Sequence, residues 1–195
     1  MRKDLLSSAV AVLVFTVLLG LAYPLVMTGA AKLVFPGAAN GSRIERDGKL
    51  VGSSLIGQDF KQGPRYFQSR PSATGYNPAG TFFNNLGPNS AELRDMLAQN
   101  LEAYLALERP DNPGLKPSEV PVDAVQTSAS GVDPHISPAN AAIQAHRVAR
   151  VRDLRLARVK ALVKANTDGR SLGILGERGV NVLELNLALD REPAR

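Results

Sequence analysis

The residues of this chain that could perform acid–base or metal chemistry are few. His135 and His146 are its only histidines, and neither stands at a metal-ligand spacing from the other or from a glutamate, so no metal site is predicted. The absence of cysteine excludes disulfides, thiolate zinc sites, iron–sulfur clusters and a cysteine nucleophile. Ser130, Asp133 and His135 could form a serine-hydrolase triad, but they lie within six residues of a turn-rich loop, which favours local hydrogen bonding. No catalytic residue is predicted.

Two motifs that act on ATP are missing. A phosphate-binding loop needs Gly-x-x-x-x-Gly-Lys-Ser/Thr, because backbone amides cradle the phosphates while the lysine reaches the outer ones. The glycine-rich residues 173–179 lack both the lysine and the hydroxyl side chain. The Asp-Lys-Thr-Gly run that carries the phosphoryl group in P-type pumps does not occur either. The chain by itself therefore cannot be the phosphorylated subunit of such a pump.

Cations offer the remaining chemistry. Arg70, next to Ser69, could bind a carboxylate or phosphate through its guanidinium, or brace its loop by bonding backbone carbonyls. Residues 143–170 hold eight Lys or Arg against two acids, a balance of +6, while the rest of the chain sums to −1. This stretch could bind an anionic polymer or form a solvated face. It has no aromatic side chain on which a base could stack, so no nucleic acid partner is expected.

A single membrane-spanning helix is predicted near the N-terminus. Residues 5–31 are 27 consecutive residues without a charge. At about 1.5 Å per residue, residues 5–23 alone would span about 29 Å of a hydrocarbon core about 30 Å thick. A cleaved secretory signal is the competing hypothesis, but the apolar region of a signal has only about 7 to 15 residues. We expect residues 1–35 to be a transmembrane anchor, with a kink facing a partner at Pro24.

The orientation of this anchor follows from what flanks it. Lys and Arg are almost evenly distributed between the two sides of the apolar run. A long following domain translocates largely regardless of its charge, whereas a short segment with Arg2 and Lys3 tends to stay inside. We expect a single-pass protein of the cell inner (plasma) membrane, in which residues 36–195 form one soluble, extracytoplasmic domain.

Helices of the soluble part are predicted from apolar spacing and capping residues. Apolar residues recur at three- and four-residue steps over residues 91–107, which predicts a helix there, with Asn89 or Ser90 as its cap. Ser137 followed by Pro138 is typical of a helix start, and this helix is expected to run to about Arg150. A second amphipathic helix is expected to follow and to end near residue 168.

Short strands are expected between the helices. Residues 49–60 favour a strand or hairpin, and residues 120–125 a short strand. Residues 180–189 are expected to be buried, with helix and strand both open. Their leucines alternate as in a strand, but Asn181 and Glu184 have capping-box spacing. The predicted fold class is an α/β (α+β) soluble domain with a single N-terminal transmembrane helix.

Several blocks of this sequence resemble one family, the C subunit of the Kdp high-affinity potassium-transporting P-type ATPase. The resemblance covers nearly the whole chain, and the blocks occur in the family's order. One departure is residues 81–84, Thr-Phe-Phe-Asn, where the family usually has a small Ser/Gly run. The matching blocks are residues 23–25, 39–42, 52–58, 66–73, 76–78, 85–86, 121–123 and 128–131, then Asp133, Ile136, Pro138 and Gln144, and finally residues 147–149 and 180–190.

The resemblance implies a non-catalytic subunit of an ATP-driven potassium uptake pump. Implied partners are a channel-like potassium-binding subunit, the ATP-hydrolysing P-type subunit, a small membrane peptide and the lipid bilayer. The implied role is to stabilise the complex and, as a catalytic chaperone, to raise the ATP affinity of the hydrolysing subunit. No tightly bound cofactor is implied, and ATP enters only through that subunit. A membrane-anchored serine hydrolase and an anionic-polymer binding module remain the alternatives.

The resemblance also marks candidate site residues. Gln144 is the candidate nucleotide contact, with Arg147 the nearest phosphate partner. Such contact requires a cytoplasmic soluble domain and so conflicts with the predicted topology. From outside, any effect on ATP must pass through membrane helices, and the domain is expected to cover the potassium entrance. The candidate structural or interface residues are Ser69, Arg70, Tyr76 and Asn77.

Overall fold

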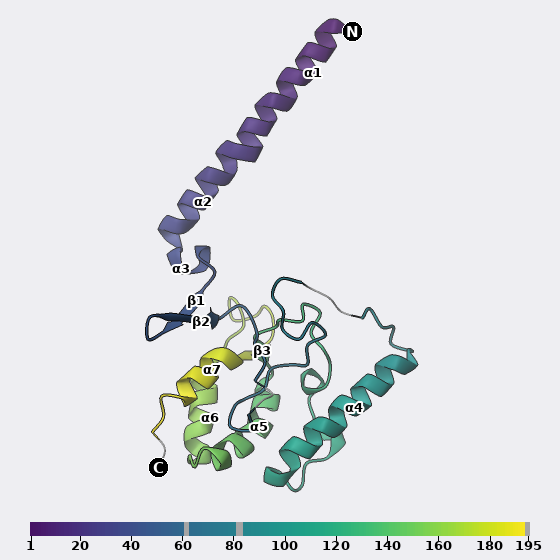
Figure 1. Cartoon of the computed structure of the whole chain (residues 1–195), viewed down its shortest axis with the longest axis vertical. Helices are drawn as coiled ribbons and strands as arrows, with labels where there is room; N and C mark the ends of the chain where they lie inside the picture. Colours follow the sequence, from purple (N-terminus) through teal and green to yellow (C-terminus); the bar gives the residue numbers. More distant parts are fainter. Residues whose placement is uncertain (61–62, 81–83, 194–195) are drawn as a thin grey trace. The chain divides into compact units, whose positions relative to one another are not determined.

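The computed structural model describes residues 1–60, 63–80 and 84–193, and its chain divides into two compact units, Met1–Ser53 and Ser54–Arg195 (Figure 1). The departure noted at residues 81–84 lies, except for Asn84, outside the described residues. The boundary expected after residue 35, between a membrane anchor and a soluble domain, stays a prediction.

The N-terminal unit contains a long helix followed by a β-hairpin. The helix runs over Arg2–Val34 and is long and apolar enough to cross a membrane. It consists of α1 (Arg2–Phe15), the π-helical η1 (Thr16–Ala22) and α2 (Tyr23–Val34). The π-helical turns end just before Pro24, which has no N–H to bond the carbonyl four residues earlier. The short α3 (Pro36–Ala39) leads to β1 (Arg43–Arg46) and β2 (Lys49–Ser53), which pair antiparallel.

Helices of the C-terminal unit begin at the predicted serine caps. The Oγ of Ser90 accepts a hydrogen bond from the Leu93 N–H (3.3 Å) at the start of α4 (Ala91–Glu108). Ser137 caps α5 (Pro138–Val151) in the same way. The helix that follows, α6 (Leu156–Ala165), ends about three residues earlier than expected, because the Asn166 side chain bonds its last turn.

A small antiparallel sheet lies beside these helices. β5 (Gly179–Asn181) is its central strand, between β3 (His135–Ile136) and β4 (Thr167–Asp168). The chain passes directly from β5 into α7 (Val182–Leu189), where Asn181 Oδ1 accepts from the Glu184 N–H (3.1 Å). Helix and strand were both open for residues 180–189, and the structure contains both: the end of a short strand followed by a capped helix. Their predicted burial is confirmed.

The predicted strand over residues 120–125 is wrong. The chain there forms 3-10 turns, η3 (Pro117–Glu119) and η4 (Val122–Ala124), after the similar turn η2 (Arg109–Asp111). Pro121 has no N–H to donate to a strand partner. Asp123 instead turns its carboxylate to the start of α5, where it accepts from the Ser137 N–H (2.8 Å). A carboxylate at a helix N-terminus stabilises that helix.

The hydrophobic core joins α5, α6 and α7, which lie close together in Figure 1, to the sheet and to one irregular segment. The irregular segment contributes Phe67, whose side chain is fully buried. The other most deeply buried apolar residues are Ile136, Ala141, Ala145, Val148, Val159, Val180, Val182, Leu185 and Leu189. Because residues 64–68 cross this core without being a helix or a strand, their backbone groups need partners from side chains.

Candidate functional site

Two side-chain amides supply the partners of the irregular segment. Asn186, in α7, accepts from the Phe67 N–H and donates to the Phe67 carbonyl, both at 2.9 Å. Gln144, in α5, accepts from the Gln68 N–H (2.7 Å) and donates to the Gln68 carbonyl (3.1 Å). Each side-chain amide thus bonds the segment as a neighbouring strand would in a sheet. The two hydrogen bonds of each amide pair a backbone N–H and a backbone carbonyl, whose burial without partners would cost free energy.

Arg147 completes the support of this segment. Its guanidinium donates to the carbonyls of Pro64 and Tyr66 and, through Nη2, to Gln144 Oε1 (3.0 Å). Its Nε donates to Glu108 Oε1 (2.9 Å), at the end of α4. The side chains of this ion pair are 1 % and 0 % exposed. The pair therefore joins α4, α5 and the irregular segment inside the unit.

Burial also determines the electrostatics of this pair. Removal from water raises the pKa of the Glu108 carboxyl above its ordinary value, against the opposing effect of Arg147. The second carboxylate oxygen, Oε2, is buried without a hydrogen-bond partner among the described residues. A buried charge pair is tolerated when its partners are hydrogen-bonded, and breaking it leaves an uncompensated charge.

The two candidate nucleotide contacts therefore lie inside the domain. Gln144 and Arg147 are each 1 % exposed, and Gln144 donates its second amide hydrogen to Asn140 Oδ1 (2.9 Å). Both amide hydrogens of Gln144 are thus used within the unit, and its Oε1 accepts two bonds. The structure brings these two residues together. Nucleotide binding by them stays a prediction.

Sequence reasoning missed several members of this network. Asn140 donates to Asp123 and accepts from the Tyr104 hydroxyl (2.9 Å), which burial keeps protonated by raising its pKa. Asn186 carried a usable signal, because it is a lone amide between leucines in an apolar run. Glu108 carried none, since a glutamate ending a helix is ordinarily exposed.

The second group of candidate residues organises a loop. Arg70 Nη1 donates to Asp133 Oδ2 (3.0 Å), and Nη2 donates to the Thr127 carbonyl (3.4 Å). Both interpretations of Arg70, carboxylate binding and loop bracing, are thus realised within the unit. The neighbouring Ser69 is buried, and its Oγ donates to the Gln58 carbonyl (3.1 Å).

Tyr76 closes this loop on itself. It lies at φ +61°, a backbone conformation that non-glycine residues rarely adopt, and its hydroxyl donates to the Arg70 carbonyl. Burial raises the pKa of Tyr76, which keeps the hydroxyl a donor. Asn77 is exposed, and its Oδ1 accepts from the Ala79 N–H (3.0 Å). Ser72 fastens the loop to the opposite one by donating to the Gly131 carbonyl (2.6 Å).

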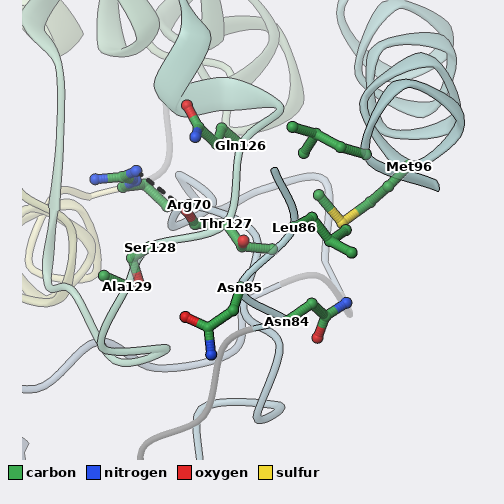
Figure 2. Close-up of a pocket in the computed structure, with 10 residues that line it drawn as sticks. Arg70, Asn84, Asn85, Leu86, Met96, Gln126, Thr127, Ser128 and Ala129 are labelled. Carbon is green, nitrogen blue, oxygen red and sulfur yellow. Dashed lines mark hydrogen bonds between the residues drawn. The ribbon is translucent and has the colours of Figure 1, made fainter. Parts of the chain in front are cut away.

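Beside this loop lies a pocket of about 570 Å³ (Figure 2). Figure 2 shows the dashed bond from Arg70 to Thr127 at one side and Met96, from α4, at the other. The lining of the pocket mixes amide, hydroxyl and apolar side chains from four segments of the chain. The lining residues are Arg70, Asn84, Asn85, Leu86, Leu93, Met96, Gln126, Thr127, Ser128 and Ala129. Arg70 already pairs with Asp133, so the pocket has no uncompensated charge from it.

The residues of the imagined triad are arranged differently from a hydrolase. Ser130 Oγ accepts from the Val132 N–H (3.2 Å), a local turn bond. His135 Nε2 lies 2.9 Å from Asp168 Oδ2, and its Nδ1 lies 3.9 Å from Asp133 Oδ1. In the part of the chain that the structure describes, Ser130 and His135 share no hydrogen bond. The imidazole thus lies next to two carboxylates, those of Asp168 and Asp133.

Most of the basic stretch is paired inside the C-terminal unit. The ion pairs are Arg147–Glu108, Arg150–Asp111, Arg152–Asp190, Arg158–Glu192 and Arg170–Glu177. Arg155, Lys160 and Lys164 form no ion pair among the described residues. These three side chains would neutralise few phosphates, so the stretch offers weak electrostatic binding to a polyanion.

Comparison with known proteins identifies the family. The model of the family described as "KdpC: K+-transporting ATPase, c chain" matches residues 5–191. A potassium-transporting ATPase KdpC subunit of Bradyrhizobium diazoefficiens is 47 % identical over 209 residues, covering 100 % of both chains. The subunits of the same name from Polaromonas naphthalenivorans and Koribacter versatilis are 52 % and 48 % identical, each covering 97 % of this chain and 95 % of its own. The chain belongs to the KdpC family of potassium-transporting ATPase subunits.

Proposed function

We propose that this chain is a non-catalytic accessory subunit that stabilises the pump complex from outside the cytoplasm. The observation that carries the proposal is the use of polar side chains within the C-terminal unit. Gln144 and Arg147 bond the irregular segment and Glu108, and the Ser130 hydroxyl bonds its own loop. Side chains with these internal partners build a rigid domain and supply no reactive group.

The same proposal includes the catalytic-chaperone role implied by the resemblance. In it the chain raises the ATP affinity of the hydrolysing subunit indirectly, through contacts among membrane helices, and its C-terminal unit covers the potassium entrance. The helix over Arg2–Val34 supports the membrane part, because its length and apolar composition suit a span. Direct ATP contact by Gln144 would require its bonds to Gln68 to break.

The partners proposed are the channel-like potassium-binding subunit, the ATP-hydrolysing P-type subunit and the small membrane peptide. The test is a detergent pull-down of the tagged full-length chain, read by mass spectrometry. The expected result is that the P-type subunit and the channel-like subunit co-purify with it. Purification of the chain free of both would overturn the proposal.

A second assay addresses the enzyme alternatives. The chain separated from the complex is expected to hydrolyse no ATP, and a serine-reactive fluorophosphonate is expected to leave Ser130 unlabelled. Ser130→Ala serves as the matched control, because among the described residues this side chain bonds only the neighbouring Val132 N–H. Turnover by the separated chain, or labelling that Ser130→Ala abolishes, would show that the chain is an enzyme.

A further inference from the structure

The N-terminal unit has several cations close to the end of its apolar helix. Residues 32–53 contain four Lys or Arg against two acids, a balance of +2. Lys32 lies in the last turn of the helix, Arg43 in β1 and Lys49 in β2. All three side chains are exposed and form no ion pair or hydrogen bond among the described residues. These three side chains are therefore available to an anion.

Hydrogen bonds hold the β1–β2 hairpin close to the end of this helix. The Ser42 N–H donates to the Gly37 carbonyl (2.9 Å), so β1 begins beside the first residues of α3. At the other end of the hairpin, Ser53 Oγ donates to the Gly41 carbonyl (2.7 Å). Both ends of the hairpin are thus tied to residues 36–42, the short segment that follows the helix (Figure 1).

The apolar side chains just before α3 indicate where the membrane surface lies. Leu33 is 85 % exposed, and Val34 and Phe35 are each 64 % exposed, so these side chains favour burial in lipid. A helix longer than the hydrocarbon core can achieve this burial by tilting, while Lys32 extends its ammonium to the headgroups. The headgroup layer is about 5 to 8 Å thick on each side. Because α3 starts directly after Phe35, the base of the hairpin then lies in this layer.

We infer that the β1–β2 hairpin binds lipid, with the phosphates of anionic headgroups as its occupant. The hairpin is continuous with the membrane-spanning helix, and its unpaired cations have the opposite charge to these phosphates. Arg43 would bind phosphate oxygens through two N–H groups, and Lys32 and Lys49 would bind them as point charges. The inference requires the helix to span the membrane, and it holds for either orientation of the chain.

The pairing register of the hairpin supports an anion near its turn. Arg46 lies directly opposite Lys49, although like charges in that position destabilise a strand pair. Arg46 Nε lies 3.9 Å from Asp47 Oδ2, whereas Lys49 has no ion pair in the part of the chain that the structure describes. A phosphate beside Lys49 would reduce the repulsion. An acidic protein surface has the same charge, but lipid phosphates are present wherever the helix spans a membrane.

Spin-label depth measurements on the full-length chain in vesicles test the inference. The chain has no native cysteine, so a nitroxide on Leu50→Cys reports on the hairpin and leaves its cations in place. The matched control is a nitroxide on Ser118→Cys, at an exposed position of the C-terminal unit. In phosphatidylcholine vesicles with added phosphatidylglycerol, the label at position 50 is expected at headgroup depth, less accessible to a water-soluble nickel chelate than the label at position 118. Equal accessibility of the two labels would overturn the inference.

Removal of two cations separates lipid binding from simple proximity to the membrane. Each basic residue near an anionic surface strengthens binding about fivefold, so Arg43→Gln with Lys49→Gln is expected to raise the nickel accessibility at position 50 towards that at position 118. The control, Arg155→Gln with Lys160→Gln, removes two exposed cations of the C-terminal unit and is expected to leave it unchanged. Protection that persists in the hairpin variant, or that requires another pump subunit and not phosphatidylglycerol, would overturn the inference.

Discussion

Two regions of the C-terminal unit differ in which side chains they bury. Around residues 64–68, Arg147 and Glu108 are buried, although charged residues are usually at the surface. On residues 170–178, Leu172 and Ile174 are exposed, although leucine and isoleucine are usually inside. Each region departs from the common rule. The buried charges have internal hydrogen-bond partners, whereas most of the surface of the two exposed aliphatic side chains is uncovered by the described residues.

This difference separates folding from assembly. A buried polar network that is almost fully bonded fixes one arrangement of its elements and leaves little for a ligand. An exposed apolar loop lowers solubility unless a partner covers it. In this chain, the candidate site residues Gln144 and Arg147 bond other parts of the C-terminal unit, whereas the side chains of Leu172 and Ile174 are exposed.

The largest expected effect is the loss of the buried ion pair. Arg147→Met leaves the Glu108 carboxylate and the carbonyls of Pro64 and Tyr66 without their donor. Breaking a buried pair in this way typically costs about 3–5 kcal/mol of unfolding free energy. Denaturant unfolding of the full-length chain in detergent measures it.

The matched control for Arg147→Met is Lys160→Met, which removes an exposed cation that forms no ion pair in the described part of the chain. The double variant Glu108→Leu with Arg147→Met is expected to recover part of the loss, because no buried charge then remains. An Arg147→Met variant as stable as the Lys160→Met control would show that the network does not hold the irregular segment.

The next effect concerns the loop bound by Arg70. Arg70→Ala removes the donors to Asp133 and to the Thr127 carbonyl, and hydrogen bonds to charged groups are worth about 1.5–3 kcal/mol. We expect lower stability together with reduced complex yield and potassium uptake. Arg155→Ala, at an exposed arginine without an ion pair among the described residues, is the control. If Arg70→Ala kept the wild-type complex yield and potassium uptake, Arg70 would have no role at the subunit interface.

A smaller effect follows from the ionisation of Glu108. Burial raises its pKa in the folded chain above the unfolded value, so the folded state holds this proton more tightly. Its contribution to stability is present below the unfolded pKa and is lost as pH rises through the folded pKa. One proton can contribute at most about 1.4 kcal/mol per pH unit.

The Glu108→Gln variant isolates this contribution, since glutamine does not ionise. The stability of the native chain relative to this variant is expected to decline as pH rises through that window, measured by denaturant unfolding at a series of pH values. A relative stability that increases with pH would mean that Arg147, and not burial, controls the carboxyl.

The smallest effect is expected from Tyr76→Phe. The substitution keeps the ring and removes one hydrogen bond to the Arg70 carbonyl, which is worth about 1 kcal/mol. The same substitution at Tyr23, in the apolar helix, is the control and should leave the unfolding of the C-terminal unit unchanged. A loss as large as that of Arg147→Met would place Tyr76 inside the buried network.

Much of the fold was predictable because local signals agreed with the final packing. The apolar spacing over residues 91–107 and the caps at Ser90 and Ser137 mark helices that the structure contains. The strand predicted over residues 120–125 is absent because Pro121 has no N–H to donate to a neighbouring strand, and the chain forms 3-10 turns instead.

The candidate site was less predictable, because its partners come from distant parts of the sequence. Gln144 could be singled out by resemblance, but its bonds to Gln68 depend on how α5 packs against an irregular segment 76 residues earlier. The pairing of Arg147 with Glu108 likewise joins two helices across 39 residues. Local patterns report periodicity and caps, and they contain no information on such long-range pairs.

The most direct test of the account is the side of the membrane on which the C-terminal unit lies. The chain has no native cysteine, so single replacements report cleanly. Ser118→Cys is in the exposed turn η3, and Ser7→Cys is in the apolar helix. In intact cells, a membrane-impermeant maleimide is expected to label Ser118→Cys and to leave Ser7→Cys unlabelled. Labelling of Ser118→Cys only after the membrane is broken would contradict the account, because the unit would then face cytoplasmic ATP.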